Sequence, residues 1–229
     1  MDRRTFLTAT AGAAVALAVG GAASAAPPER VLFEWYRPGG FFNPGVGVFE
    51  PPPLAVYDDG TAFADAAASL RLPPASVRAL RTQALRALST PVDTTRGDRP
   101  THAVRVLAAD GRMLSAHLDA GPVVALPALL HDLYDEVQRL RRRVLRGEPW
   151  RPPAVLLATV KVGYLPDSSD IWPYKAPPDG WYAEQRLRGP AALDVQRRLP
   201  RAAEPVWPVY RVGPANYVAA TWRYLLPHE

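Results

Sequence analysis

LAVYDDGTAFA (residues 54–64) is the stretch that decides the fold of the first half of this chain. Two runs of β-prone, mainly apolar residues flank the dipeptide Asp59-Gly60. This dipeptide is typical of a tight turn between antiparallel strands, because both central residues of the favoured turn need a positive φ. The stretch therefore predicts a β-hairpin.

Further strands and a helix are predicted on both sides of this hairpin. In VLFEWY (31–36), aromatic and aliphatic residues alternate with others, which is typical of a strand. HAVRVLAADGRMLSAHL (102–118) repeats the hairpin pattern around Asp110-Gly111. Between them, ASVRALRTQALRAL (75–88) follows two prolines and carries apolar residues at helical spacing. The order strand, hairpin, helix, hairpin indicates a small antiparallel sheet with a helix packed on it.

ALPALLHDLYDEVQRLRRRVLRGEP (125–149) gives the clearest helix pattern in the chain. Its apolar positions step by three and four residues along one face, at Leu130, Leu133, Val137, Leu140 and Val144. Acidic residues gather near its start and arginines near its end, an order that complements the helix dipole. Those charges therefore need no ligand to explain them, and Gly147 with Pro149 ends the helix.

The composition changes after Trp150. AVLLATVKVGY (154–164) is typical of a buried strand, and residues 165–179 are too rich in Pro, Asp and Ser to be regular. A short helix is expected at 192–199 and a strand or hairpin at 209–226. We therefore predict an α+β fold of two small antiparallel sheets, each covered by helices, with a first domain at 26–150 and a second, smaller one at 151–229.

An export signal is predicted ahead of both domains. The chain starts MDRRTFLTATAGAAVALAVGGAASAA, in which Arg3-Arg4 precedes a moderately apolar run and the triplet Ala23-Ser24-Ala25. A twin arginine before Phe-Leu points to the twin-arginine route, with cleavage after Ala25. Removal of the signal and its retention as an anchor both remain open. The mature chain has no later run apolar enough to span a membrane, so we expect a soluble protein that is secreted or extracytoplasmic.

The composition excludes several classes of chemistry. With 0 cysteines there is no disulfide, thiolate metal site or cysteine nucleophile, and 26 prolines argue against a mostly helical fold. The formal net charge of +5 is modest, and the arginines are scattered apart from Arg141-Arg142-Arg143. We therefore expect no nucleic-acid partner.

Catalytic motifs are absent from the sequence. It contains no H-E-x-x-H, G-x-S-x-G, P-loop or G-x-G-x-x-G pattern, and we predict neither a cofactor nor a metal. Among the 4 histidines, His117 stands two residues before Asp119 at the end of a predicted strand. Both side chains could face one side of the sheet and share a metal or a proton, although a histidine hydrogen-bonded on a sheet face explains the pair more simply.

A cluster of aromatic residues in the second half suggests binding. Trp and Tyr recur among prolines at Trp150, Tyr164, Trp172, Tyr174, Trp181 and Tyr182. Buried, these rings would fasten an irregular segment to a sheet, which is the simpler interpretation; exposed, they would offer large and rigid contact area for a protein or a sugar.

Several stretches together resemble a family of exported actinobacterial proteins of uncharacterised function. They are the LAVYDDGTAF hairpin, the helix after it, IWPY (171–174) and the ending ANYVAATWRYLLPHE (215–229). The family pattern is a VYGDG hairpin, a WP loop and a closing Y-x-x-x-x-R-P-L-L-P-[DH]-E. Asp58 stands where that family commonly has Gly, and Tyr224 where it has Pro. The resemblance implies a location outside the cytoplasm and no particular activity.

The first domain also resembles, more weakly, emfourin-type domains that inhibit thermolysin-like metalloproteases. WYRPGGFF matches their Arg-x-Gly-Gly-Phe opening at Arg37, Gly39, Gly40 and Phe41, and departs from it after Phe41. A glycine pair in a loop between strands has an ordinary structural explanation as well. The resemblance implies that the partner is a protease.

Taken together, these features predict an exported, non-enzymatic binding module. Its expected binding residues are Arg37, Gly39, Gly40, Phe41, Trp172, Tyr174, Trp181 and Tyr182, with an extracellular or envelope protein favoured over a carbohydrate as partner. The alternative is a cell-envelope hydrolase that uses His117 and Asp119.

Overall fold

The computed structural model describes residues 30–36, 50–89, 102–118, 127–163, 169–175, 180–201 and 207–229. Within these ranges it has three helices and two sheets, antiparallel apart from one strand pair, so the α+β class is confirmed. The predicted signal peptide, the Arg37–Phe41 loop with Gly39 and Gly40, and Asp119 lie outside the described residues. Predictions that concern them remain predictions.

The first sheet has the strand order β6-β5-β1-β2-β3-β4-β7. Its strands are β1 (Val31–Tyr36), β2 (Leu54–Tyr57), β3 (Thr61–Ala64), β4 (Ala68–Arg71), β5 (His102–Leu107), β6 (Met113–Leu118) and β7 (Glu148–Pro149). All neighbours in the sheet run antiparallel. The strands β4 and β7 are additional to the predicted set; β4 is ordered by its pairing with β3, and the two-residue β7 by its pairing with β4.

The predicted hairpin is confirmed, with a different turn. Residues 58–60 form a three-residue connection between β2 and β3, in which the Gly60 amide donates to the Tyr57 carbonyl at 3.0 Å. Only Gly60 has a positive φ, of 89°, so the expectation of two such residues was wrong. The Asp59 carboxylate accepts hydrogen bonds from the backbone and hydroxyl of Thr61, and this local bonding favours the longer turn.

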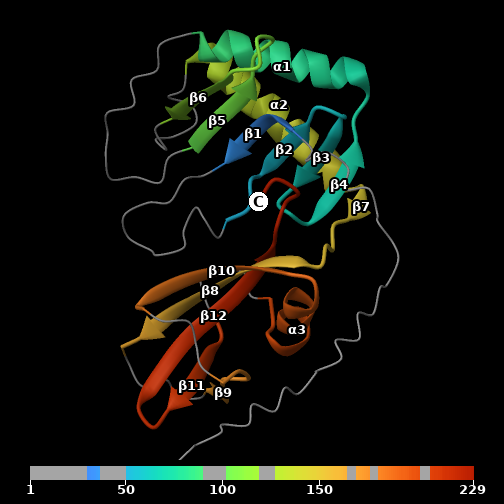
Figure 1. Cartoon of the computed structure of the whole chain (residues 1–229). Helices are drawn as coiled ribbons and strands as arrows, with labels where there is room; N and C mark the ends of the chain where they lie inside the picture. The colour runs from blue at the N-terminus through green and yellow to red at the C-terminus, as the bar shows by residue number, and fades with distance from the viewer. Residues whose placement is uncertain are drawn as a thin grey trace, which may run out of the picture.

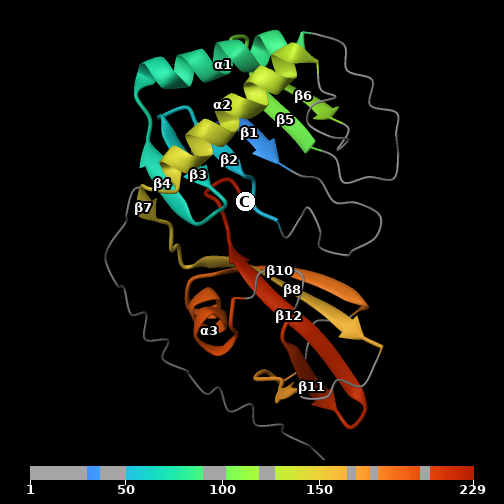
Figure 2. The same ribbon diagram turned by 180° about the vertical axis from the view of Figure 1, so that it is seen from behind.

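Two helices pack against one face of the first sheet. They are α1 (Pro74–Leu88) and α2 (Ala128–Val144), and Figure 2 shows both in front of the strands. All five predicted apolar positions of α2 are buried, in one cluster with side chains of α1, β1, β2 and β5. Burial of each such Leu or Val contributes about 1.5–3 kcal/mol to folding. This cluster is the main core of the chain.

The second sheet has the strand order β10-β8-β12-β11-β9. It consists of β8 (Ala154–Val162), β9 (Asp170–Ile171), β10 (Tyr182–Arg188), β11 (Val209–Gly213) and β12 (Asn216–Tyr224), with α3 (Pro190–Arg198) beside it (Figure 1). The sequence did not predict β10, because its residues YAEQRLR show no alternation of apolar and polar types. The β9 and β11 strands pair in parallel.

The chain returns to the first sheet at its C-terminus. Figure 1 shows β12 running along the length of the second sheet toward the first sheet, with the C-terminus beside the strands of the first sheet. Leu226 is buried in a cluster with Val31 and Tyr57 of the first sheet. The indole of Trp150 packs edge-on against Phe63 at 4.5 Å between ring centroids and donates to the Leu225 carbonyl at 3.1 Å. The last residues therefore connect the two sheets.

A buried polar network accompanies this contact. Glu34 on β1 is only 2% exposed and forms an ion pair with Arg105 of the neighbouring strand β5. Its other partner is His228, whose Nε2 lies 3.2 Å from Glu34 Oε1 and whose Nδ1 lies 2.6 Å from the Tyr57 hydroxyl. A buried carboxylate is costly unless it is paired. Residues from β1, β2, β5 and the C-terminus together meet that requirement.

Replacement of Glu34 by glutamine should lower the free energy of unfolding by about 2–3 kcal/mol, because it leaves Arg105 and His228 without their shared anion. The cost is expected at the low end for buried pairs, since a third of the Arg105 side chain is exposed (34%). Urea unfolding of Glu34→Gln measures the change. Glu148→Gln on exposed β7 is the matched control, and equal losses in both variants would contradict the role of the network.

The last residue adds a pH-dependent contact. Burial raises the pKa of the Glu229 carboxyl, but hydrogen bonds from Arg223 and from the Leu226 amide outweigh it and hold the pKa below its ordinary value of 4.5. The Arg223 guanidinium, 3% exposed, donates to this carboxylate at 2.6 and 2.7 Å. A depressed folded pKa stabilises the fold above the unfolded pKa and loses that contribution as the pH falls through the folded value.

Stability of the wild type should therefore fall more steeply below about pH 4.5 than that of Glu229→Gln, which has no such side-chain carboxyl to protonate. Urea midpoints measured from pH 7 down to acid for both proteins provide the comparison. If the urea midpoints of the two proteins fall equally with pH, protonation of Glu229 does not contribute to the pH dependence of stability.

Candidate functional site

The structure separates the four predicted aromatic binding residues into two pairs. Trp172 and Tyr174 follow β9, while Trp181 precedes β10 and Tyr182 begins it. These two strands form opposite edges of the second sheet. A single ligand surface made of all four residues is therefore not formed, and each pair is a separate candidate.

Trp172 is part of the core of the second sheet. It is 6% exposed and packs edge-on against Tyr174 and Tyr210, with ring centroids 5.3 and 5.5 Å away. The same cluster contains Val195 and Leu199 at the α3 end. The Trp172 ring therefore fixes the segment after β9 in place and does not offer its face to a ligand.

A pocket of about 390 Å³ lies beside this ring, within the roughly 300–1,000 Å³ range of ligand pockets. We call it the aromatic pocket, and it is lined by Ile171, Trp172, Tyr174, Lys175, Arg211, Val212, Gly213 and Pro214. The parallel pairing of β9 with β11 brings the two chain segments together. The sequence pattern did not predict this pocket, because Arg211 is far from Trp172 along the chain.

The aromatic pocket combines an apolar group with two cations. Ile171 is 72% exposed, the highest fraction among the large apolar side chains of the described ranges. Lys175 and Arg211 are exposed, and no ion pair joins either to another described residue. An exposed aliphatic side chain beside unpaired cations suits a ligand that carries both an apolar and an anionic group.

Backbone groups at this edge also face outward. The Trp172 amide donates to the Arg211 carbonyl at 3.0 Å, so residues 170 and 172 direct their backbone groups toward β11. Successive residues of a strand alternate. The amide and carbonyl of Ile171 therefore point away from β11, at the open edge of the sheet.

Three polar atoms around Trp172 have no hydrogen-bond partner within the described chain. They are the Trp172 indole Nε1 and the hydroxyls of Tyr174 and Tyr210. Burial raises the pKa of both phenols, with added contributions from Asp194 at Tyr174 and from Asp170 at Tyr210. Both hydroxyls thus stay protonated at neutral pH and remain able to donate a hydrogen bond.

The opposite edge of the sheet presents a different surface. Trp181 is 61% exposed, and the Tyr182 hydroxyl donates to the Glu184 carboxylate. Burial, followed by that hydrogen bond, raises the pKa of Tyr182 far above its ordinary value. The Trp181 ring is thus accessible to solvent, whereas the Tyr182 hydroxyl is hydrogen-bonded to a residue of its own strand.

His117 lies on the face of the first sheet that the helices do not contact. It is exposed on edge strand β6, opposite Ala103 of β5, and that residue is opposite Tyr36 of β1. No described acid pairs with it, and Asp119 is outside the described residues. The hydrolase alternative gains no support from this position and stays a prediction.

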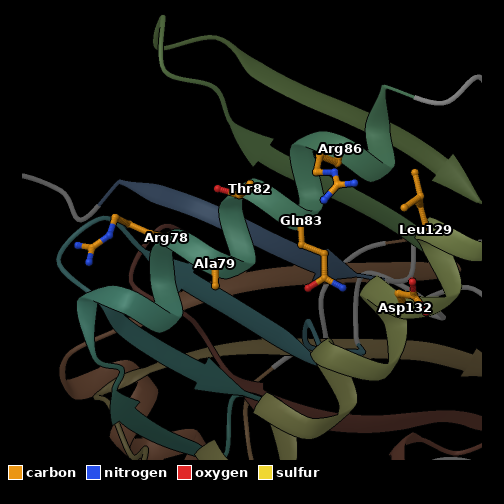
Figure 3. A pocket seen from close by; sticks show the side chains of 7 residues that line it. All are labelled: Arg78, Ala79, Thr82, Gln83, Arg86, Leu129 and Asp132. Carbon is orange, nitrogen blue, oxygen red and sulfur yellow. The ribbon is translucent and has the colours of Figure 1, made fainter.

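A larger hollow of about 540 Å³ runs between α1 and α2 (Figure 3). Its side chains come from Arg78, Ala79, Thr82, Gln83, Arg86, Leu129 and Asp132, and Figure 3 shows Arg78 pointing away from the others. All of them except Gln83 are exposed. We call it the helix groove; solvated side chains on two amphipathic helices account for it without a ligand.

Within the described ranges, no three His, Asp or Glu side chains are placed to hold a metal ion. None of the helices in those ranges combines the length and the apolar character that crossing a membrane requires. Comparison with family models, curated proteins and solved structures gave no match.

Tyr210→Phe should leave the free energy of unfolding unchanged or raise it by about 1 kcal/mol, because it removes a buried hydroxyl that has no partner among the described residues. Tyr57→Phe is the matched comparison and should lose about 1 kcal/mol, since its hydroxyl bonds to His228. Urea unfolding of both variants tests this. A loss in Tyr210→Phe equal to that in Tyr57→Phe would mean that the Tyr210 hydroxyl has a partner.

Proposed function

We propose that this chain is an exported, non-enzymatic binding module whose ligand site is the aromatic pocket. The ligand is an extended, acidic segment of another protein outside the cytoplasm. One observation supports this most directly: the exposed Ile171 lies on an edge strand and lines a pocket with two cations that form no ion pair with another described residue. Export itself rests on the sequence of residues 1–25.

The edge position supports a peptide as the ligand. An extended segment can add to an open sheet edge, where backbone hydrogen bonds give affinity and pockets for side chains give specificity. The outward amide and carbonyl of Ile171 supply one such pair of bonds. The Ile171 side chain then contacts an apolar residue of the incoming segment.

The cations support an acidic ligand. Lys175 and Arg211 line the same pocket, and the whole chain has a formal net charge of +5. Complementary charge speeds encounter and selects partners more than it adds affinity. A segment with carboxylates on both sides of an aliphatic residue could pair with Lys175 and Arg211 and pack its aliphatic side chain on Ile171.

The burial of Trp172 favours a protein over a carbohydrate at this site. A sugar would need an accessible ring face, and the Trp172 ring is enclosed by Tyr174 and Tyr210. The inhibitor version of the proposal, with a protease as partner, depends on the Arg37–Phe41 loop outside the described residues. That version would use residues other than those that line the aromatic pocket.

Selection from a random peptide library displayed on phage tests the proposal with the chain starting at Ala26 as the target. We expect enrichment of peptides with acidic residues next to an aliphatic one, and binding that weakens as salt is raised. In Lys175→Glu/Arg211→Glu the affinity for a selected peptide should fall at least about tenfold, because two attractions become repulsions.

Arg186→Glu is the matched control, since it reverses a charge on β10 at the other edge of the sheet. It should bind the selected peptides as the wild type does. Selected peptides without acidic enrichment, or equal affinity in the double variant, would refute the proposed function.

A further inference from the structure

A second concave site, independent of the aromatic pocket, lies in the first half of the chain. Its volume is about 450 Å³, and its polar side chains belong to Glu50, Asp65, His102, Tyr134, Gln138 and Arg141. Three of these come from α2, His102 starts β5, and Asp65 stands in the turn after β3. We call it the polar pocket.

The polar pocket is set into the surface, unlike the helix groove. Each of its six polar residues is half-buried, whereas the helix groove is lined mainly by exposed residues. Half-buried polar groups are partly stripped of water before a ligand arrives. Hydrogen bonds formed there replace fewer bonds to solvent than those made by fully exposed groups.

One wall is held rigid by an ion pair. Arg141 donates hydrogen bonds to the Asp65 carboxylate from its Nε and from a terminal nitrogen, at N···O distances of 2.7 to 3.0 Å. Asp65 and Ala66 both have positive φ, of 53° and 46°, which is costly for residues with a Cβ. Backbone in such a conformation persists where its surroundings fix it, and ligand clamps are among the places where this occurs.

An aromatic cluster also contributes to the lining of the polar pocket. Tyr134 packs on Trp35 with ring centroids 5.5 Å apart, and its ring contacts that of His102 edge-on, with centroids 6.2 Å apart. The Trp35 indole, which can only donate, gives its hydrogen bond to His102 Nδ1 at 3.1 Å. His102 therefore carries its proton on Nε2 when neutral, and its ring orientation is fixed.

We propose that the polar pocket binds a neutral saccharide. Carboxylates and the Gln138 amide are planar groups with two hydrogen-bonding atoms each, and the Arg141 guanidinium carries five N–H donors in one plane. This geometry matches the adjacent hydroxyls of a sugar ring. The half-buried Tyr134 ring supplies the apolar wall on which the C–H face of a sugar packs. Charges of both signs on the walls favour a ligand with many hydroxyls over one with a net charge.

Saturation-transfer NMR on the chain from Ala26 tests the inference with glucose, N-acetylglucosamine, maltose and cellobiose, each titrated to its solubility limit. We expect signal from at least one of them, strongest for the protons of one ring face, because Tyr134 contacts that face. Gln138→Leu should weaken its binding by about tenfold, the cost of losing hydrogen bonds to one hydroxyl pair.

Tyr134→Ala should weaken binding further, but it also removes packing on Trp35, so Gln138→Leu is the decisive variant. Gln83→Leu in the helix groove is the matched control and should bind as the wild type does. Absence of signal for all four sugars would overturn the inference. Unchanged affinity in Gln138→Leu, or an equal loss in Gln83→Leu, would also overturn it.

Discussion

The pairing of one buried carboxylate, that of Glu34, constrains the rest of this structure. It lies on β1, between β5 and β2 of the first sheet, and is buried where an unpaired charge would cost several kcal/mol. Arg105 satisfies it from the neighbouring strand, and His228 does so from the far end of the chain. The C-terminal residues must therefore return to the first sheet, and the Trp150 and Leu226 contacts follow from that return. In this way a local electrostatic requirement joins segments from both ends of the described chain.

This arrangement separates structural residues from those available for binding. The densest polar contacts, around Glu34, Tyr57, His228 and Glu229, are satisfied within the chain and leave few groups to recognise another molecule. Figure 1 shows β9 and β11, the strands beside the aromatic pocket, at the end of the second sheet that is far from the first sheet. A ligand can therefore bind at β9 without disturbing the contact between the sheets. An edge strand with unpaired backbone groups can also pair with other chains and aggregate unless a partner covers it. Binding of a peptide at β9, as proposed, would cover these groups.

Sequence patterns predicted the elements whose signal is local, and failed where chemistry depends on distant partners. The apolar stripe of α2 and the hairpin dipeptides report on the residues that form them, so those elements were found in place. Strand β10 was missed because its residues are mainly polar and its pairing with β8 supplies the order. Arg211 and Lys175 were missed because only the parallel pairing of β9 with β11 brings them together. His228 was noted within a distinctive ending, yet nothing local indicated Glu34 as its partner.

Hydrogen exchange measured by NMR on the chain from Ala26, alone and with a selected acidic peptide, tests the central claim most directly. The account predicts that the Ile171 amide, which points away from β11, exchanges rapidly in the free protein and becomes protected when the peptide adds to the sheet edge. Amides of β10 at the opposite edge should not change. Protection confined to β10, or no change at Ile171 with the peptide bound, would contradict the assignment of the ligand site to the β9 edge.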